Sequence, residues 1–373
     1  MRQADAIIIG SGIIGLSLAI ELNKRGLRVL VADKGEPGRE ASWAAGGMLA
    51  DFPLEMAPAL RNLASASARM YPEFVRELED ESRMKIDLRD KGAIVFRQIS
   101  EADVGDAAGS ARFVKGLDAA TIAERFSLPP SEWDLELVLE IWSRYAGLTP
   151  MFLRERSVDP RELTAAAIAA AKHRGIEFSS GDAVFAVELA DGKAAGVRTK
   201  RTRFSAGVVV NCAGAWAGQI GPIPLPTRPV KGQMLCVIMP KKESVRHAIR
   251  MPEVYLIPRS DGRLLIGATQ EEAGFDKQTA PETIRRLHRA AMDAVPELSA
   301  ARMLEAWAGL RPGTPDALPI LGATPVPGYS VATGHFRDGI LLAPVTGKVM
   351  GQVMCGESAA FDLNAFSMSR FEG

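Results

Sequence analysis

The sequence predicts an α/β fold in two parts, one built on a parallel sheet covered by helices and one built on an antiparallel sheet with helices. Three observations support this. An apolar run near the N-terminus leads through a glycine-rich turn into a helical pattern, and the same order recurs near the C-terminus. Between them, extended runs at 228–238 and 254–268 carry a hairpin signal at Asp261-Gly262, which indicates antiparallel strands. A chain of 373 residues is long enough for two domains.

The first glycine turn follows the apolar run Ala6–Ile9 and has the spacing G-x-G-x-x-G. Gly10 permits a tight turn, Gly12 lets the backbone approach a phosphate, and Gly15 lets the next helix lie close to the strand. The N–H groups and the positive end of that helix would then face a dinucleotide pyrophosphate. This order predicts a Rossmann-like dinucleotide-binding domain, and an ordinary β-α-β unit without a ligand is the alternative.

The residues after the turn complete the β-α-β pattern. Gly26 ends the first helix as a C-cap glycine does, and Arg28–Asp33 is typical of a second strand. Asp33 lies at the end of this strand, where its carboxylate can accept hydrogen bonds from ribose hydroxyls.

Further elements follow from hydrophobic periodicity and turn signals. Asp159 is a good N-cap, Pro160 suits the first helical position, and Glu162 has capping-box spacing, in a helix that ends at Gly175. Strands are expected at 91–96, 176–178, on both sides of Asp191-Gly192, and at 207–211, 228–238, 254–268, 302–310 and 329–333. Helices are expected at 58–84, at 281–295 and from near Gly339, with short helices and loops over 100–130.

The composition argues against several kinds of partner. Basic and acidic residues number 45 each, so nothing in the charge suggests nucleic acid or an anionic membrane. The three cysteines, Cys212, Cys236 and Cys355, are far apart and in apolar contexts, so we expect buried reduced thiols and no metal site. The glycines within the apolar N-terminal stretch argue against a signal peptide, and no apolar run is long enough to span a bilayer. We therefore expect a cytoplasmic protein.

The closing turn is the second strong signal. A helix that begins near Gly339 would present free N–H groups and partial positive charge, which would stabilise a reduced flavin. The alternative is the last helix of an ordinary α/β sheet. Because strand, turn and helix recur here, the dinucleotide domain is expected to be discontinuous in sequence.

Several blocks together point to a family. They are Gly10–Gly15, Asp33, Ala44–Met48, Val208–Trp216, Pro229–Gln233, Ala308–Asp316 and Gly334–Gly347. Over essentially the whole chain, these blocks resemble the D-amino-acid oxidase (DAO) family of FAD-dependent oxidoreductases, and within it the bacterial glycine oxidase branch of thiamine biosynthesis. The blocks Gly334–Gly347 and Leu310–Pro312 are the specific part of this resemblance.

The resemblance implies a fold, an activity and partners. The FAD-binding domain would comprise 1–85, 145–220 and 312–373, and the substrate domain 86–144 and 221–311. The activity would be oxidative deamination of glycine or a small amino acid, by hydride transfer to flavin N5, giving a 2-oxo acid, ammonia and hydrogen peroxide. A small amino acid or amine and oxygen would be the partners, in a homo-oligomer that is a tetramer in the resembling enzymes.

The resemblance also implies roles for individual residues. Arg311 would bind the substrate carboxylate, Tyr255 would add a hydroxyl, and Arg337 would close the site. The positions implied to bind the cofactor are Gly10, Gly12, Ile13, Ile14, Gly15, Asp33, Lys34, Ala41, Ser42, Gly46, Gly47, Met48, Val184, Gly214, His335, Phe336, Arg337, Asp338, Gly339, Ile340 and Leu341.

Each catalytic assignment has a plainer alternative. Arg311 can supply two parallel N–H groups to a carboxylate, but it could also bind backbone carbonyls. Tyr255 could be a core aromatic, and Arg337 could form a surface pair with Asp338. For His335, a structural hydrogen bond is favoured over a role as general base. The other histidines, His173, His247 and His288, lie in polar contexts and are expected to be solvated.

Two departures from the family pattern bear on chemistry. Ala308–Asp316 contains no cysteine and Ala41–Met48 no histidine, which predicts noncovalent FAD. Glu253 stands where the resembling enzymes have a histidine, and Gln270 where they have a methionine. If both shape the substrate end, sarcosine or another small polar amine becomes a candidate beside glycine. A dehydrogenase that passes electrons to a carrier, and a flavin-binding protein without turnover, are the competing functions.

Overall fold

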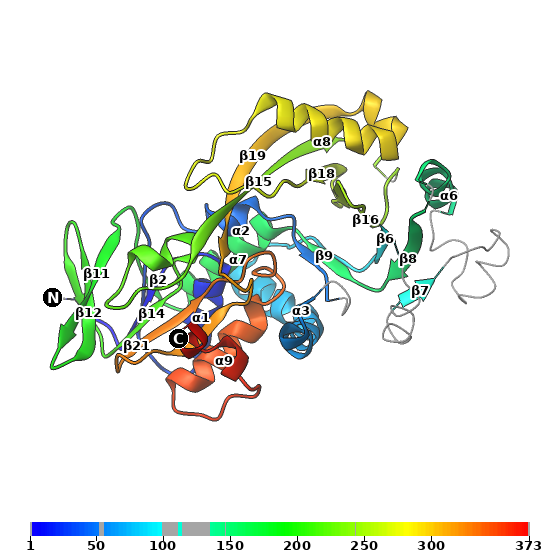
Figure 1. Ribbon diagram of the computed structural model, residues 1–373. Helices are drawn as coiled ribbons and strands as arrows, with labels where there is room; N and C mark the ends of the chain where they lie inside the picture. Colours follow the sequence, from blue (N-terminus) through cyan, green and yellow to red (C-terminus); the bar gives the residue numbers. More distant parts are fainter. Residues whose placement is uncertain are drawn as a thin grey trace.

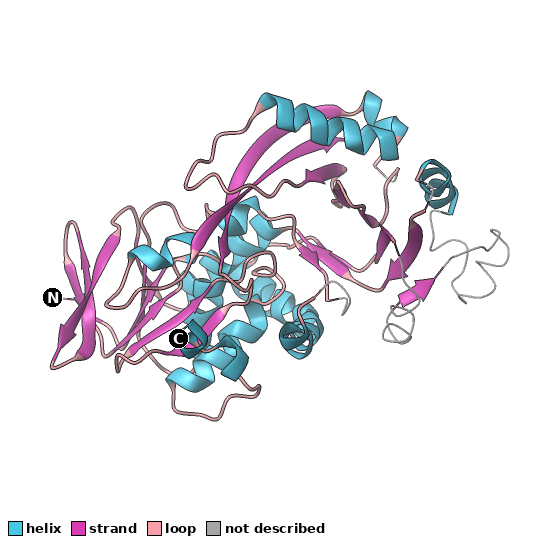
Figure 2. Ribbon diagram, viewed as in Figure 1, coloured by secondary structure: helices cyan, strands magenta, loops and turns pink. Residues whose placement is uncertain are grey.

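The computed structural model describes residues 2–51, 56–98, 111–113, 135–145, 147–242 and 244–371. In these ranges the chain forms two main sheets, which lie beside each other in Figure 1 and are drawn in magenta in Figure 2. Most of the stretch 100–130, expected to hold short helices and loops, lies outside the described residues. No helix in the described ranges is both long and apolar enough to cross a bilayer.

The first sheet, here the parallel sheet, has six strands in the described part of the chain. Their order is β10 (Glu177–Ser179), β3 (Val29–Ala32), β2 (Ala6–Ile9), β14 (Val208–Asn211), β21 (Tyr329–Thr333) and β20 (Ile320–Ala323). Neighbouring strands run parallel except for β20, which is antiparallel to β21. Strands β2 and β3 are buried throughout, as expected for a sheet covered on both faces.

Helices cover one face of the parallel sheet and a second sheet covers the other (Figure 1). The helices are α1 (Ile13–Lys24), α3 (Arg61–Ser82), α7 (Pro160–His173) and α9 (Ala343–Met354). The second sheet comprises β1 (Arg2–Gln3), β13 (Arg203–Ser205), β12 (Lys193–Thr199) and β11 (Val184–Ala190). Because side chains alternate along a strand, Ile8 packs with the helices whereas Ile7 packs with β11 and β12.

The large sheet is mostly antiparallel and has eight described strands. Their order is β19 (Arg302–Gly313), β15 (Arg228–Ile238), β18 (Arg263–Gly267), β17 (Tyr255–Pro258), β16 (Ala248–Arg250), β6 (Ala93–Arg97), β8 (Thr149–Leu153) and β7 (Ala111–Phe113). Helix α8 (Pro281–Ala294) lies across one face at the top of Figure 1, and Leu287 packs there on Leu235 and Ile266. Helix α6 (Leu135–Arg144) shares this apolar layer through Ile141.

The opposite face of the large sheet carries Met234, Tyr255 and Ile257, which pack with Trp43 and Ala44 of the short helix α2 (Ala41–Ala44). A small sheet of β4 (Met48–Leu49), β9 (Arg156–Val158) and β5 (Leu88–Arg89) pairs, within the described residues, with neither main sheet. Because successive side chains along β15, β17 and β18 point to opposite faces, one face of this sheet is covered by helices and the other meets α2.

The strand order bears on where the FAD-binding and substrate domains meet in the sequence, and we propose refined boundaries from it. The parallel sheet draws its strands from the three segments assigned to the FAD-binding domain. However, β8 at Thr149–Leu153 is a strand of the large sheet, and β19 extends to Gly313. We therefore propose that the substrate domain reaches to about 154 on one side and 313 on the other.

Three local expectations need correction. The last helix, expected near Gly339, begins at Ala343, because Pro344 lacks an N–H and fits only in a first turn. Glu162 does not close a capping box on Asp159, since its carboxylate accepts instead from the Asp87 N–H. His247, expected to be solvated, is buried, with Nδ1 2.6 Å from the Lys91 carbonyl oxygen.

Candidate functional site

A cavity of about 820 Å³ lies at the carboxyl ends of the parallel strands and reaches the large sheet. Residues that follow β2, β3, β14 and β21 line it, namely Gly10, Asp33, Gly214 and His335. In open α/β sheets, ligands bind at this edge. Of the site residues expected from the sequence, all line the cavity except Gly15 and Leu341.

The glycine turn has the geometry that its spacing predicts. Gly10 has a φ of 104°, and a Cβ there would lie 2.5 Å from the Cys212 carbonyl oxygen. A Cβ on Gly15 would collide with the carbonyl of Gly10, so Gly15 acts in packing and does not line the cavity. Gly12 lies between these two and faces the cavity at the start of α1. The turn therefore presents backbone to a ligand, as a pyrophosphate requires.

Two side chains hold this turn in place. Ser42 Oγ accepts from the Ile13 N–H at 2.9 Å. Asp33 Oδ2 accepts from the N–H of Ser11 at 2.7 Å and from its hydroxyl at 2.6 Å. Asp33 Oδ1 accepts from the Gly35 N–H at 2.9 Å. Asp33 thus lines the cavity where a ribose is expected and also fixes the glycine turn, a second role that its sequence position did not reveal.

The outer part of the cavity has an aromatic wall; its tryptophan, Trp216, ends the sequence block Val208–Trp216 but was not assigned to the site. The Lys34 ammonium lies 3.2 Å from the centre of the Trp216 ring and 3.1 Å from a Glu40 carboxylate oxygen. Trp216 lines the cavity together with Val184 and Gly214. Because Trp216 belongs to no glycine motif, only the folded arrangement brings it to the cavity.

The turn after β21 forms the other end of the cavity. His335 is buried, with Nε2 3.1 Å from the Thr346 hydroxyl, and burial lowers its pKa to about 3. Burial raises the pKa of Asp338 to about 6, although the nearby charge of Arg337 opposes this shift. Arg337 is exposed, and among the described residues no ion pair joins it to Asp338. His335 is therefore neutral and structural at physiological pH.

The substrate end is built from one row of residues across the large sheet. Pairing places Arg250 opposite Tyr255, Tyr255 opposite Gly267, and Gly267 opposite Met234. A Cβ on Gly267 would lie 2.7 Å from the Tyr255 ring, so the ring lies directly over this glycine. Glycine inside a strand marks such a close approach, and this signal was present in the sequence.

Arg311 lies in the adjacent part of the same face. A Cβ on Gly232 would collide with the Arg311 guanidinium, so this side chain lies flat over a second strand glycine. Arg311 Nη1 donates to the Thr269 carbonyl oxygen at 3.0 Å. Burial raises the pKa of the Tyr255 hydroxyl, and the nearby charge of Arg311 opposes that shift. The phenol and the guanidinium therefore lie together in the cavity wall, and Tyr255 remains a protonated donor.

Glu253 and Gln270 do not shape this end of the cavity. Both are exposed and neither lines the cavity, so the expectation that they alter its polarity was wrong. The wall is formed instead by Arg250 and Met251. Arg250 forms a buried ion pair with Glu155 at 2.9 Å. Strand register places these residues, and single-sequence motifs carry no signal for it.

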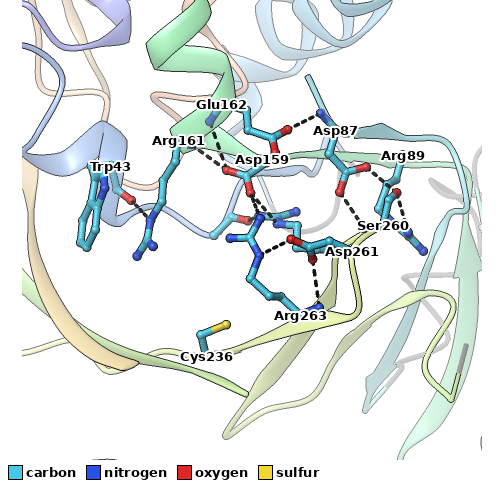
Figure 3. Close-up of polar contacts among 12 residues, drawn as sticks. Trp43, Asp87, Arg89, Asp159, Arg161, Glu162, Cys236, Ser260, Asp261 and Arg263 are labelled. Carbon is cyan, nitrogen blue, oxygen red and sulfur yellow. Dashed lines mark hydrogen bonds and ion pairs between the residues drawn. The ribbon is translucent and has the colours of Figure 1, made fainter. Parts of the chain in front are cut away.

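A buried polar network, shown in Figure 3, lies behind the cavity wall. Asp159 Oδ2 pairs with Arg263 Nη2 at 2.8 Å and with Arg259 Nε at 3.8 Å, while Oδ1 caps α7. Arg259 Nη2 donates to the Gly46 carbonyl oxygen at 2.6 Å. In Figure 3, Arg161 of α7 turns towards Trp43, and Arg161 Nε donates to the Trp43 carbonyl oxygen at 3.3 Å. The network thus fixes the cofactor segment 43–46 against the large sheet.

These residues fit FAD. One continuous cavity joins the glycine turn, the Trp216 wall, the turn after β21 and the Arg311–Tyr255 pair. Its volume of about 820 Å³ lies in the upper part of the range of small-molecule sites, as a dinucleotide requires. The glycine turn would hold the pyrophosphate, and the turn 335–340 would lie at the flavin ring.

Comparisons with known proteins agree with this fit. The chain is 32% identical to glycine oxidase of Pseudomonas aeruginosa, covering 95% of this chain and 96% of that protein. It is 33% identical to the bifunctional protein ThiO/ThiG of Synechocystis, covering 99% of this chain but 54% of that protein, so it spans about half the length of that relative. The crystal structure of glycine oxidase from Geobacillus kaustophilus superimposes with a TM-score of 0.87 at 30% identity, covering 99% of both chains.

The family comparison covers most of the chain. The model of the DAO family, described as FAD dependent oxidoreductase, matches residues 5–353. This match and the full-length similarity confirm the family and the α/β fold that the motifs predicted. The chain belongs to the DAO family of FAD-dependent oxidoreductases.

Proposed function

We propose that this FAD-dependent oxidoreductase deaminates glycine or another small amino acid oxidatively and uses oxygen as its electron acceptor. The observation that carries the proposal is the pairing of Arg311 with Tyr255 in the cavity that also holds the dinucleotide turn. A half-buried guanidinium beside a protonated phenol is a donor set for a carboxylate. The names of the similar glycine oxidases support the same substrate class.

The protein's own residues bind and orient the substrate. The Arg311 guanidinium, flat over Gly232, presents its edge to the carboxylate, and the Tyr255 hydroxyl donates a further hydrogen bond. Bound FAD supplies the hydride acceptor and returns the electrons to oxygen. Holding the substrate Cα in one position contributes to the rate by removing the entropy cost of orientation.

No general base is assigned in this proposal. The substrate amine has to be neutral when the hydride leaves, and it can lose its proton to water on binding. His335 is excluded as the base by its pKa of about 3 and by its bond to the Thr346 hydroxyl. Arg337, exposed at the edge of the cavity, is proposed to contact the substrate or cofactor when the site is filled.

Apolar side chains and one ion pair form the cavity wall beside Tyr255. Met234 and Met251 supply flexible apolar surface, and the Arg250–Glu155 pair closes the row beside Tyr255. Since Glu253 and Gln270 lie outside the cavity, they give no reason to prefer a polar amine to glycine. Glycine and sarcosine are the first substrates to test.

FAD is proposed to be noncovalent and the enzyme to be a homo-oligomer. Of the cysteines, Cys212 lines the cavity, and burial raises the pKa of its thiol far above the ordinary value, so it is a poor nucleophile. Acid precipitation of the yellow protein should release the flavin into the supernatant. Light scattering of the holoprotein measures the assembly.

An amine panel with a peroxide readout tests the function. Glycine, sarcosine and D-alanine should each be mixed with the holoprotein, first without oxygen and then with air. We expect at least one amine to bleach the flavin, and air to restore the colour with release of hydrogen peroxide. Recovery with an electron carrier but not with air would favour a dehydrogenase. No bleaching by any amine of the panel would contradict the catalytic proposal.

A further inference from the structure

Two buried hydroxyl groups of helix α3 contact the turn that lies before α9. The Tyr71 hydroxyl donates to the Ile340 carbonyl oxygen. Ser67 Oγ donates to the Leu341 carbonyl oxygen at 2.6 Å and accepts from the Val345 N–H at 3.3 Å. Both side chains are 0% exposed. Helix α3 therefore holds two consecutive carbonyl groups of this turn from behind.

Peptide geometry then fixes the direction of the N–H groups. A trans peptide is planar, so its N–H points opposite to its carbonyl. Because the Ile340 carbonyl points to α3, the Leu341 N–H points away from α3. Gly339 and Ile340 line the cavity. The Leu342 N–H donates to the Asp338 carbonyl oxygen at 2.8 Å. In the described part of the chain, the N–H groups of Gly339, Ile340 and Leu341 have no protein acceptor.

Each hydroxyl also strengthens one donor: Tyr71 acts on the Leu341 N–H, and Ser67 acts on the Leu342 N–H that closes the turn on the Asp338 carbonyl oxygen. A hydrogen bond to a carbonyl polarises the peptide, and the N–H of the same peptide becomes a better donor. Among the described residues, the Tyr71 hydroxyl has no partner other than the Ile340 carbonyl, and burial keeps this hydroxyl from water and raises its pKa. The turn is thus both oriented and polarised by a helix that does not itself line the cavity there.

We propose that Tyr71 and Ser67 are positioning residues that set the reduction potential of the bound flavin by fixing the N–H groups of 339–341 towards its ring. The proposal rests on the placement of the flavin ring at this turn in the proposed function. A reduced flavin carries negative charge, and fixed donors stabilise that charge without reorganising. Removal of the Tyr71 hydroxyl leaves the Ile340 carbonyl oxygen, among the described residues, with only the Ala343 N–H at 3.2 Å as a donor, so the turn loosens and the Leu341 N–H becomes a weaker donor.

Sulfite binding and potentiometry test the proposal without any turnover. Sulfite adds to oxidised flavin and leaves negative charge on the ring, so its dissociation constant reports the same stabilisation. In the Tyr71→Phe holoprotein we expect that constant to rise about tenfold. The two-electron reduction potential should fall by about 30 mV, which is tenfold for a two-electron couple. Ser67→Ala should shift both in the same direction.

Tyr329→Phe is the matched control. Tyr329 is also buried, and its hydroxyl donates to a backbone carbonyl, that of Ile220 at 3.2 Å, away from the 339–341 turn. We expect this variant to lose stability but to keep the wild-type sulfite constant within twofold. The proposal would be overturned if the sulfite dissociation constant and the reduction potential of Tyr71→Phe and Ser67→Ala equalled those of Tyr329→Phe.

The sulfite and potential measurements can be interpreted whether or not the protein oxidises an amine. If wild-type protein oxidises no amine but Tyr71→Phe still shifts the potential, the proposed function fails and the positioning role stands. If amines are oxidised and the potential does not move in either α3 variant, the positioning role fails alone. If Tyr71→Phe does not fold, Ser67→Ala decides by the same two measurements.

Discussion

Arg311 carries the charge on which the proposed recognition of the substrate carboxylate depends. Its guanidinium lies over Gly232 and donates through Nη1 to the Thr269 carbonyl oxygen, which holds it in the cavity wall. Replacing Arg311 with Met removes the carboxylate donor and retains much of the volume. We expect KM for the preferred amine to rise at least a hundredfold, from the loss of about 3 kcal/mol of charge-assisted hydrogen bonding. Steady-state peroxide assays measure this.

The Arg311→Lys variant separates charge from geometry. Lysine keeps the charge but cannot donate two parallel N–H groups, so KM should still rise about tenfold. FAD affinity, measured by recovery of flavin fluorescence on dilution, should remain unchanged in both variants. A KM within threefold of wild type in Arg311→Met would contradict the role.

Asp338 makes stability depend on pH. Its pKa is raised to about 6 by burial, above the ordinary value of 3.8. A carboxyl with a raised pKa in the folded state contributes stability that is present below pH 4 and is lost as the pH rises through about 6. From that shift, the contribution is roughly 3 kcal/mol. Wild-type protein should therefore lose stability relative to Asp338→Asn between pH 4.5 and 7.5.

Urea unfolding of both FAD-saturated proteins at several pH values measures this difference. His335 acts in the opposite sense, because its lowered pKa costs stability as the pH falls below about 6.5. Since both proteins contain His335, its contribution cancels in the comparison. A constant difference in the free energy of unfolding across this range would show that Asp338 does not titrate there.

At the residue level, motifs predicted most of the residues that line the cavity, because backbone geometry determines their places. Gly10 and Gly15 occupy their places for steric reasons that spacing alone reveals. Arg250 and Tyr71 were missed, because strand register brings one to the cavity and helix packing brings the other to the turn. The expectation that Glu253 lines the pocket was wrong, because alignment with a pocket residue of the resembling enzymes does not show that the Glu253 side chain is exposed to solvent.

Strand glycines are the element-scale feature of the substrate end. Gly232 and Gly267, on neighbouring strands β15 and β18, leave room for Arg311 and Tyr255. In Gly232→Ala, the new methyl group would displace the end of a flexible arginine side chain rather than backbone. We therefore expect KM to rise tenfold or more, with a change in the free energy of unfolding below about 1 kcal/mol. Peroxide assays and urea unfolding measure the two effects.

Gly207→Ala is the matched control for this substitution. A Cβ on Gly207 meets nothing within 4 Å, and the residue lies before β14, away from the cavity. Both kinetics and stability should remain at wild-type values. Unchanged KM in Gly232→Ala would mean that Arg311 does not need its observed position.

At the element level, hydrophobic patterns predicted most described strands of the two main sheets, but not β7, β8, β16 or β20, and not helix α6. The start of the last helix was wrong by four residues, at Ala343 instead of Gly339. The preceding turn is held by α3 through Ser67 and Tyr71. These tertiary bonds replace helical hydrogen bonds and have no local signature.

At the scale of the whole molecule, the two main sheets are joined by buried charge. Asp159 starts a helix of the parallel-sheet layer, and its carboxylate pairs with Arg259 and Arg263 of the large sheet. Asp159 is 2% exposed and Arg259 is 1% exposed. Burial lowers the pKa of Arg259, and the Asp159 charge opposes that shift. This pair holds the two layers in the relative position that places Arg311 and Tyr255 in the cofactor cavity.

A double-mutant cycle tests this coupling. Asp159→Asn leaves the Arg259 charge buried without its carboxylate, so the free energy of unfolding should fall by 3–5 kcal/mol, roughly the cost of breaking a buried pair. Arg259→Met removes the charge and should cost less, while weakening FAD binding because the Gly46 carbonyl loses its donor. The double variant should be no less stable than Asp159→Asn alone, which corresponds to a coupling energy of about 2 kcal/mol.

Asp261→Asn is the control. It breaks the half-exposed pair with Arg263 on the same hairpin and should lower the free energy of unfolding by less than about 1 kcal/mol. Strictly additive costs in urea unfolding would show that Asp159 and Arg259 act separately.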